Sequence, residues 1–264
     1  MSRRRIDVIL AERGLFESRE RARAAILAGE VRVGGQVITK AGEQVAEDVE
    51  VQVAEMQRYV SRGGTKLAGA LDALSLDVTG ARAVDVGAST GGFTDCLLQR
   101  GAESVSAVDV GYGQLAWQLR QDPRVRVFER TNIRSVDPVA IGAPFDLAVV
   151  DVSFIGVLKV LPNVLELLGP EGEMMVLVKP QFEIGKGRVG KKGVVRDPAA
   201  HVEVLESVMS GMRTSGLSVK GATWSPITGP EGNIEFWIRA DRSGEDEVVD
   251  VAGLVAAAHE SLGT

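Results

Sequence analysis

Cysteine and histidine are almost missing from this chain of 264 residues. It has one cysteine, Cys96, and two histidines, His201 and His259. A single cysteine cannot form a disulfide bond within the chain, and these three residues are too few for the common zinc sites. We therefore expect no metal in this protein.

Long apolar segments are missing as well. No stretch approaches the roughly 18 uncharged apolar residues that a membrane-spanning helix needs. The basic start, Arg3–Arg5, is followed by Asp7 and Glu12, which interrupt the apolar segment that a signal peptide requires. We expect a cytoplasmic protein with no membrane partner.

The composition is otherwise ordinary. Hydrophobic residues make up 45% of the chain and charged residues 25%, which is typical of soluble globular proteins and excludes disordered or collagen-like chains. The length corresponds to one large domain, or to an ordinary domain with a small one. We expect a monomer or a weak oligomer.

Charge is distributed unevenly over the chain. The net charge is −6, but residues 1–40 carry nine basic and five acidic residues, a balance of +4. Residues 67–264 carry 18 basic and 26 acidic residues, a balance of −8. A basic head on an acidic protein indicates a polyanionic partner for the head. The alternative is a solvated basic surface without a partner.

Residues 1–57 predict a small α+β domain that begins with two helices. Ile6–Arg13 predicts a short helix that ends at Gly14. Ser18 is typical of a helix N-cap, and the alanine-rich segment Arg19–Ala28 predicts a second helix.

A tight β-hairpin is predicted next. Val31–Val33 and Gln36–Ile38 are joined by Gly34-Gly35, a turn in which both residues reach positive φ. Val45–Val53 alternates between apolar and polar residues again and predicts one further strand.

This order of elements resembles the small RNA-binding domain of ribosomal protein S-four type. The motifs that carry the resemblance are Ser18–Ala22 and Gly29–Gly35. Such domains bind RNA through its shape and its phosphates. The alternative is a small oligomerisation or lid domain. The basic residues that we assign to RNA contact, here and further along the chain, are Arg3, Arg4, Arg5, Arg19, Arg21, Arg23, Arg32, Arg62, Lys186, Arg188, Lys191 and Lys192.

Residues 58–66 interrupt the strand pattern and predict a linker. Gly63-Gly64 is expected to break the chain, and Lys66 opens an apolar pattern typical of a helix. The domain boundary is therefore placed at residue 58, and the second domain at residues 67–264.

Strands and helices alternate in the second domain. The predicted strands are Arg82–Val86, Val105–Val110, Val125–Phe128, Asp146–Asp151, Met174–Lys179, Ser218–Thr223 and Glu235–Arg239. The predicted helices between them are Phe93–Gln99, Gln114–Arg120, Val157–Leu168 and Ala199–Met212. This alternation predicts an α/β fold of Rossmann-like type with a mostly parallel, seven-stranded sheet.

A glycine-rich turn follows the first strand of that domain. Gly87–Gly92 lacks the spacing of the dinucleotide motif, and Asp109 ends the second strand, where a carboxylate can bind both ribose hydroxyls of a nucleoside. The spacing favours S-adenosylmethionine, which has no pyrophosphate; a purely structural turn is the alternative. The cofactor residues expected from this pattern are Asp85, Gly87, Ala88, Ser89, Thr90, Gly91, Gly92 and Asp109.

Charged residues end several of the later strands. Asp151 and Lys179 each follow an apolar strand, which places them at the carboxyl edge of the sheet, where ligands bind. Glu235 lies on the same edge if the last strand is an antiparallel edge strand. Lys66, on the preceding helix, can reach over this edge.

The set Lys66, Asp151, Lys179 and Glu235 resembles the catalytic tetrad of the FtsJ-like RNA ribose 2′-O-methyltransferases. With the RNA-binding head, the whole chain resembles the TlyA family of ribosomal RNA methyltransferases. The matching stretches are Tyr59–Leu67, Gly87–Phe93, Asp109–Gln114, Arg130–Asn132, Asp151–Ile155, Lys179–Glu183 and Gly229–Glu235.

The resemblance implies transfer of a methyl group from S-adenosylmethionine to the 2′-hydroxyl of cytidine in ribosomal RNA of assembled subunits. Lys179 is expected to take or steer the hydroxyl proton, with Asp151 and Glu235 orienting the lysines. Asn132, Asp151 and Phe154 are cofactor contacts by resemblance; Phe154 is otherwise an ordinary core residue. The basic start and the C-terminal tail resemble family members that modify both ribosomal subunits.

A basic, glycine-rich loop leaves the expected site. From Lys179 to Arg196 there are six basic residues and one acid, Glu183. This composition favours a phosphate clamp for RNA, with a solvated surface loop as the alternative.

Two other functions stay open at this stage. One is a small-molecule methyltransferase whose head serves dimerisation, and the other is a ribosome-assembly factor without enzymatic activity. Some members of the family carry a haemolysin label, but a pore-forming protein should show a membrane-active segment, so we do not expect direct lysis.

Overall fold

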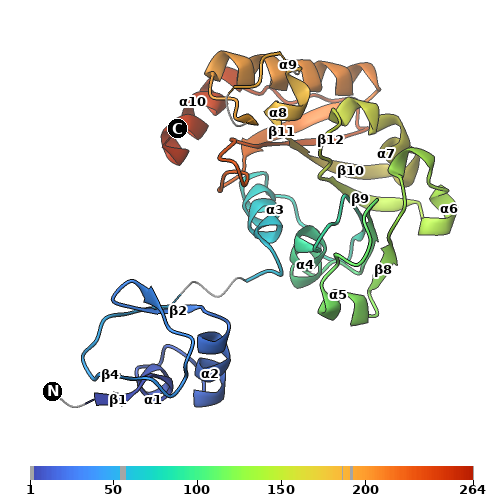
Figure 1. Ribbon diagram of the computed structural model, residues 1–264. Helices are drawn as coiled ribbons and strands as arrows, with labels where there is room; N and C mark the ends of the chain where they lie inside the picture. The colour runs from blue at the N-terminus through green and yellow to red at the C-terminus, as the bar shows by residue number, and fades with distance from the viewer. Residues whose placement is uncertain (1–2, 54–57, 186, 191–192, 264) are drawn as a thin grey trace. The chain divides into compact units, whose positions relative to one another are not determined.

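The computed structural model describes residues 3–53, 58–185, 187–190 and 193–263, and the chain forms two compact units, Met1–Arg58 and Tyr59–Thr264 (Figure 1). Among the described residues, no helix is long and apolar enough to cross a membrane.

The described part of the first unit, residues 3–53 and 58, has two helices and two small antiparallel sheets. Its elements are β1 (Arg3–Arg5), α1 (Ile6–Glu12), α2 (Arg19–Leu27), β2 (Val31–Val33), β3 (Gln36–Val37), β4 (Gln44–Ala46) and β5 (Val51–Val53). Strand β1 pairs with β4, and the other sheet has the order β3-β2-β5. Ser18 accepts a hydrogen bond from the Arg21 N–H, as its predicted role as N-cap requires.

Two features of this unit differ from the sequence-based prediction. Val45–Val53 is not one strand, because a turn in which the Val49 N–H donates to the Ala46 carbonyl separates β4 from β5. The two halves pair with different partners, β4 with β1 and β5 with β2. In addition, Arg3–Arg5 forms strand β1, which the sequence analysis did not predict.

A buried carboxylate joins the start of this unit to its second helix. Asp7 is 1% exposed, and its carboxylate accepts hydrogen bonds from Arg5 at 2.8 Å and from Arg19 at 3.0 Å. The hydrogen bond from Arg5, with that from Arg19, lowers the pKa of Asp7 to about 2 against the cost of burial.

This pKa predicts acid-sensitive packing of the first unit. A folded-state pKa below the unfolded value of 3.8 means that the ion pairs stabilise the fold fully above about pH 4, and that this stabilisation is lost as the pH falls toward 2. Asp7→Asn is expected to remove about 2 kcal/mol at pH 7 and to abolish this acid dependence. Hydrogen exchange of the amides of α1 and α2 in the full chain, followed at pH 7 and at lower pH, measures this loss of stability and its pH dependence. Equal exchange in wild type and variant at pH 7 would contradict it.

The second unit is built on a seven-stranded sheet of order β11-β12-β10-β9-β6-β7-β8. Its strands are β6 (Arg82–Val86), β7 (Ser104–Val108), β8 (Val125–Phe128), β9 (Phe145–Val150), β10 (Leu168–Val178), β11 (Ser218–Trp224) and β12 (Phe236–Asp241). The five strands from β8 to β10 are parallel, and β12 is antiparallel to both of its neighbours. The predicted mostly parallel, seven-stranded sheet is confirmed.

Helices cover both faces of this sheet, as Figure 1 shows. They are α3 (Arg62–Ala73), α4 (Gly92–Gln99), α5 (Trp117–Gln121), α6 (Pro138–Ile141), α7 (Leu161–Leu167), α8 (Pro180–Glu183), α9 (Pro198–Thr214) and α10 (Val251–Leu262), with the short 3₁₀ helices η1 (Ile133–Ser135) and η2 (Val157–Lys159). Alternate residues of β6 enter two separate apolar cores, Val84 on the side of α7, α9 and α10, and Ala83 on the side of α3, α4 and α5.

The strand order places the ligand-binding edge. From β6 the chain moves outward to β7 and β8 and then returns to β9 on the other side of β6. Open sheets of this kind bind ligands beyond the carboxyl ends of the strands at such a switch point. The residues that follow β6, β7, β9 and β10 therefore lie around one cleft edge.

The glycine pair Gly63-Gly64 does not break the chain as expected, since α3 already begins at Arg62. A Cβ on Gly64 would lie 2.2 Å from Cγ of Tyr59, so glycine allows the helix to pack closely on this buried ring. The second compact unit accordingly includes residues 59–66. Strand β12 was considered as an antiparallel edge strand. It is antiparallel, but it lies inside the sheet, and β11 forms the edge.

Candidate active site

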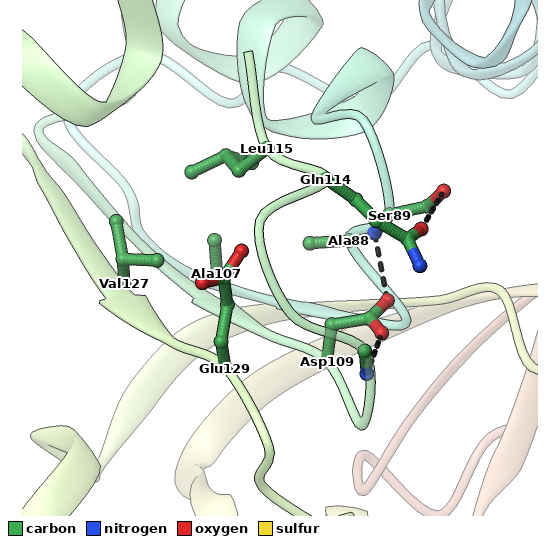
Figure 2. Close-up of a pocket in the computed structure, with 9 residues that line it drawn as sticks. Ala88, Ser89, Ala107, Asp109, Gln114, Leu115, Val127 and Glu129 are labelled. Carbon is green, nitrogen blue, oxygen red and sulfur yellow. Dashed lines mark hydrogen bonds between the residues drawn. The ribbon is translucent and has the colours of Figure 1, made fainter. Parts of the chain in front are cut away.

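A small pocket opens at the carboxyl ends of β6, β7 and β8 (Figure 2). It is lined by Ala88, Ser89, Ala107, Asp109, Gly111, Gln114, Leu115, Val127 and Glu129. The Asp109 carboxylate accepts hydrogen bonds from the Ser89 N–H at 2.8 Å and from the Gly111 N–H at 2.6 Å. These two bonds fix the carboxylate and leave each of its oxygens able to accept one more donor.

The glycines of the turn after β6 are required by the protein's own packing. Gly87 has a φ of +88°, and a Cβ there would lie 2.1 Å from the carbonyl oxygen of Asp151. Gly91 has a φ of +93°, and a Cβ there would lie 2.3 Å from Cδ1 of Leu119. The turn is therefore held tightly between the end of β9 and α5.

A test of this packing is the substitution Gly87→Ala. The new methyl group collides with the backbone after β9, and alanine is strained at this φ. We expect a loss of about 2–4 kcal/mol of unfolding free energy, measured by thermal or denaturant unfolding. Gly187→Ala is the matched control, because no atom of the described residues lies within 4 Å of the position that its methyl group would take, and it should unfold like wild type. A Gly87→Ala protein as stable as the control would contradict the argument.

Asp85, on β6, is buried below this turn. One of its oxygens, Oδ2, accepts hydrogen bonds from the Thr94 N–H at 3.0 Å and from the Thr94 hydroxyl at 2.7 Å. The other, Oδ1, is buried without a hydrogen-bond partner among the described residues. Burial, with the negative charges of Asp151 and Asp109, raises the pKa of Asp85 to about 7. An unpartnered buried carboxylate oxygen is suited to bind a cationic donor.

The four expected tetrad residues form two ion pairs. Lys66 Nζ lies 2.5 Å from Glu235 Oε2, and both side chains are buried. Lys179 Nζ forms an ion pair with Asp151 and also donates a hydrogen bond to the Ser153 hydroxyl at 3.0 Å. The second pair is the more accessible one, because the Asp151 side chain is 24% exposed.

The strand register brings these pairs to the same edge. Val178 of β10 is paired with Phe236 of β12, so the next step of the antiparallel register sets Lys179 beside Glu235. Asp151 directly follows β9, where its N–H donates to the Val86 carbonyl at 2.9 Å. The site therefore lies where the carboxyl ends of β9 and β10 meet the amino end of β12.

Asn132 and Phe154, which the resemblance predicts to contact the cofactor, are both exposed. Asn132 is exposed and accepts a hydrogen bond from the Arg134 N–H at 3.0 Å, which caps η1. Phe154 has a φ of +65° and is 91% exposed, so the interpretation of this residue as a core residue is wrong. Its ring centre lies 5.1 Å from that of Phe182.

Most of the arginines expected to contact RNA already bond within the chain. The pairs are Arg3 with the Gln44 carbonyl, Arg4 with Glu12 and Glu47, Arg5 and Arg19 with Asp7, Arg32 with the Gly35 carbonyl, Arg62 with the Thr228 carbonyl, and Arg188 with Glu203. Arg21 and Arg23 lie exposed on α2. Lys186, Lys191 and Lys192 lie outside the described residues.

The sequence analysis missed three polar residues of this region. Ser153 accepts from Lys179, and Gln114 and Glu129 line the pocket of Asp109. Glu129 directly follows β8, so its position at the end of a strand was a usable signal. Ser153 gave no such signal, since its contact depends on the path of a loop.

A Rossmann-like sheet with a carboxylate-lined pocket and two lysine–carboxylate pairs at its switch point defines a methyltransferase fold. The chain belongs to the FtsJ-like methyltransferase family, whose model matches residues 59–242. The S4 domain model matches residues 4–51. The family, the fold class and the enzyme class inferred from the sequence are confirmed.

Known proteins resemble the chain over nearly its full length. The 16S/23S rRNA (cytidine-2′-O)-methyltransferase TlyA of Mycobacterium tuberculosis is 45% identical, with 99% of this chain and 98% of that protein covered. Hemolysin A of Brachyspira hyodysenteriae is 37% identical over 88% of this chain and 97% of that protein. A solved structure from Streptococcus thermophilus, provisionally named a hemolysin, is 42% identical with a TM-score of 0.77 and covers 100% of this chain and 98% of its own.

Proposed function

We propose that this protein transfers a methyl group from S-adenosylmethionine to the ribose 2′-hydroxyl of cytidine in ribosomal RNA. The observation that carries the proposal is the accessible Lys179–Asp151 pair at the sheet edge that also holds the Asp109 pocket. Membership of the FtsJ-like family and the printed activity of the Mycobacterium relative support the reaction and the nucleotide.

The described residues fit S-adenosylmethionine. The Asp109 carboxylate has acceptor capacity left for two ribose hydroxyls, and Leu115 and Val127 give the pocket apolar walls for a flat base. The unpartnered Oδ1 of Asp85 suits an ammonium group. Bound to these residues, S-adenosylmethionine supplies a methyl group on a positively charged sulfur.

The Lys179–Asp151 pair acts on the accepting hydroxyl. A ribose hydroxyl is a weak acid, so the reaction requires that it be oriented and that its proton be removed. Lys179 Nζ already donates to one hydroxyl, that of Ser153, and can hold a ribose oxygen in the same manner. Asp151 keeps the lysine in place, and its carboxylate accepts the hydroxyl proton and passes it to water.

The Lys66–Glu235 pair has a supporting role in this proposal. A buried ion pair that loses one partner leaves an uncompensated charge, which costs about 3–5 kcal/mol. Lys66 therefore anchors Glu235, and with it the start of β12, beside Lys179.

Recognition of the RNA is assigned to the S4 domain. The exposed Arg21 and Arg23 of α2 can contact phosphates without giving up a bond described above. The name of the Mycobacterium relative includes both ribosomal RNAs, and we extend this to the present chain: both subunits are substrates, and the enzyme acts in the cytoplasm where they assemble.

Nucleoside analysis tests the proposed reaction. Small and large subunits that lack the modification are incubated separately with the protein and S-adenosylmethionine, and their RNA is digested to nucleosides for mass spectrometry. The proposal predicts 2′-O-methylcytidine from each subunit. A methylated base, another ribose-methylated nucleoside or methylation of a free metabolite alone would contradict it.

A further inference from the structure

The two chain segments that carry Asp151 and Lys179 are joined to each other beyond the sheet. After Asp151 the chain forms a loop, residues 152–156, that leads into η2, and after Lys179 it forms the short helix α8. Glu183, the last residue of α8, accepts a hydrogen bond through Oε1 from the Val157 N–H at 2.8 Å. A side chain from one segment thus holds the end of the other.

Two further contacts reinforce this connection. A Cβ on Gly156 would lie 2.9 Å from Glu183 Oε2, so the carboxylate lies directly against the loop backbone. The rings of Phe182 and Phe154 lie 5.1 Å apart. Phe182 and Glu183 of α8 therefore contact the loop at its middle, Phe154, and at its end, Gly156.

The Glu183 carboxylate also satisfies a helix end. Val157 is the first residue of η2, and its N-cap, Gly156, has no side chain that could accept the free N–H. Burial raises the pKa of Glu183, while the Val157 N–H and the charge of Lys159 oppose this shift. The carboxylate therefore supplies, at 2.8 Å, the acceptor that the N-cap residue lacks.

The position of the loop matters because it contains one partner of Lys179, Ser153, and directly follows the other, Asp151. Ser153 accepts from Lys179 Nζ at 3.0 Å, and Asp151 pairs with the same atom. We propose that Glu183 is a positioning residue for methyl transfer: by fixing loop 152–156 to α8, it sets where Lys179 Nζ meets Asp151 and Ser153. The inference rests on the proposed role of the Lys179–Asp151 pair.

The substitutions Glu183→Gln and Glu183→Ala test this proposal. Glutamine keeps the size and an acceptor but removes the charge, whereas alanine removes the bond. We expect kcat for subunit RNA to fall about tenfold with glutamine and about 100-fold with alanine, because small displacements of reacting groups are costly, and KM for S-adenosylmethionine to stay unchanged. Glu206→Gln, an exposed glutamate of α9, is the matched control and should behave like wild type.

A second readout does not depend on methylation. The NMR signal of ¹³C-labelled Lys179 in the free protein reports the surroundings of its ammonium group, with the signal assigned by its loss in Lys179→Arg. If Glu183 positions the partners of Lys179, Glu183→Gln shifts or broadens this signal at pH 7, and Glu206→Gln does not.

The outcomes separate this inference from the proposed function. A Glu183→Gln protein with wild-type kcat and a wild-type Lys179 signal overturns the positioning role, whatever its unfolding temperature. Absence of methyl transfer by the wild-type protein overturns the proposed function, and the Lys179 signal then decides on Glu183 alone.

Discussion

Lys179→Ala is expected to lower the rate of methyl transfer to ribosomal RNA about 10²–10⁴-fold, the range that a positioned acid–base group contributes. The variant removes the group that pairs with Asp151 and donates to Ser153. Binding of S-adenosylmethionine should change little, because the Asp109 pocket involves other residues. Single-turnover kinetics with saturating cofactor measure the effect.

The control for this variant is Lys220→Ala. Lys220 lies near the start of the edge strand β11, where it donates to the Glu245 carbonyl. This part of β11 pairs with the end of β12 that is opposite to Glu235. Loss of Lys220 should leave the rate within about a factor of two. A Lys179→Ala enzyme that is as fast as this control would remove Lys179 from the mechanism.

Asp109→Ala is expected to weaken binding of S-adenosylmethionine about 10²–10⁴-fold. The change removes the charged acceptor that the proposal assigns to two ribose hydroxyls, each bond contributing about 1.5–3 kcal/mol. It also releases the Ser89 and Gly111 N–H groups, which bond to Asp109 beside the pocket. Isothermal titration calorimetry gives the dissociation constant.

A comparison with an exposed carboxylate makes this measurement specific. Asp48→Ala, in the first unit, should bind the cofactor like wild type. If Asp109→Ala binds as tightly as Asp48→Ala, the pocket of Figure 2 is not the nucleoside site.

The charged residues that end apolar segments were the most informative feature of the sequence for locating the site. Asp109, Asp151 and Lys179 were found because apolar runs end at them, and parallel strands bring their carboxyl ends to one edge. The structure places all three at that edge. The seven-stranded sheet was predictable for the same reason, since alternating strands and helices allow few other arrangements.

Contacts that depend on loop paths could not be predicted. Gly63-Gly64 looked like a chain break, but the need for glycine arises from the ring of Tyr59, which packs on the helix. Ser153 and Glu183 lie in segments whose course is set by tertiary contacts rather than by periodicity. The number of arginines predicted the positive charge of the first unit. It could not predict that Arg5 and Arg19 form ion pairs with the buried Asp7.

The most direct test of the central claim uses S-adenosylmethionine with a tritiated methyl group. Wild type and Lys179→Ala are each incubated with unmodified small subunits, unmodified large subunits and naked ribosomal RNA. The account predicts label on a ribose 2′-oxygen of subunit RNA with wild type and its loss with the variant. Cofactor binding without label on any RNA would contradict it.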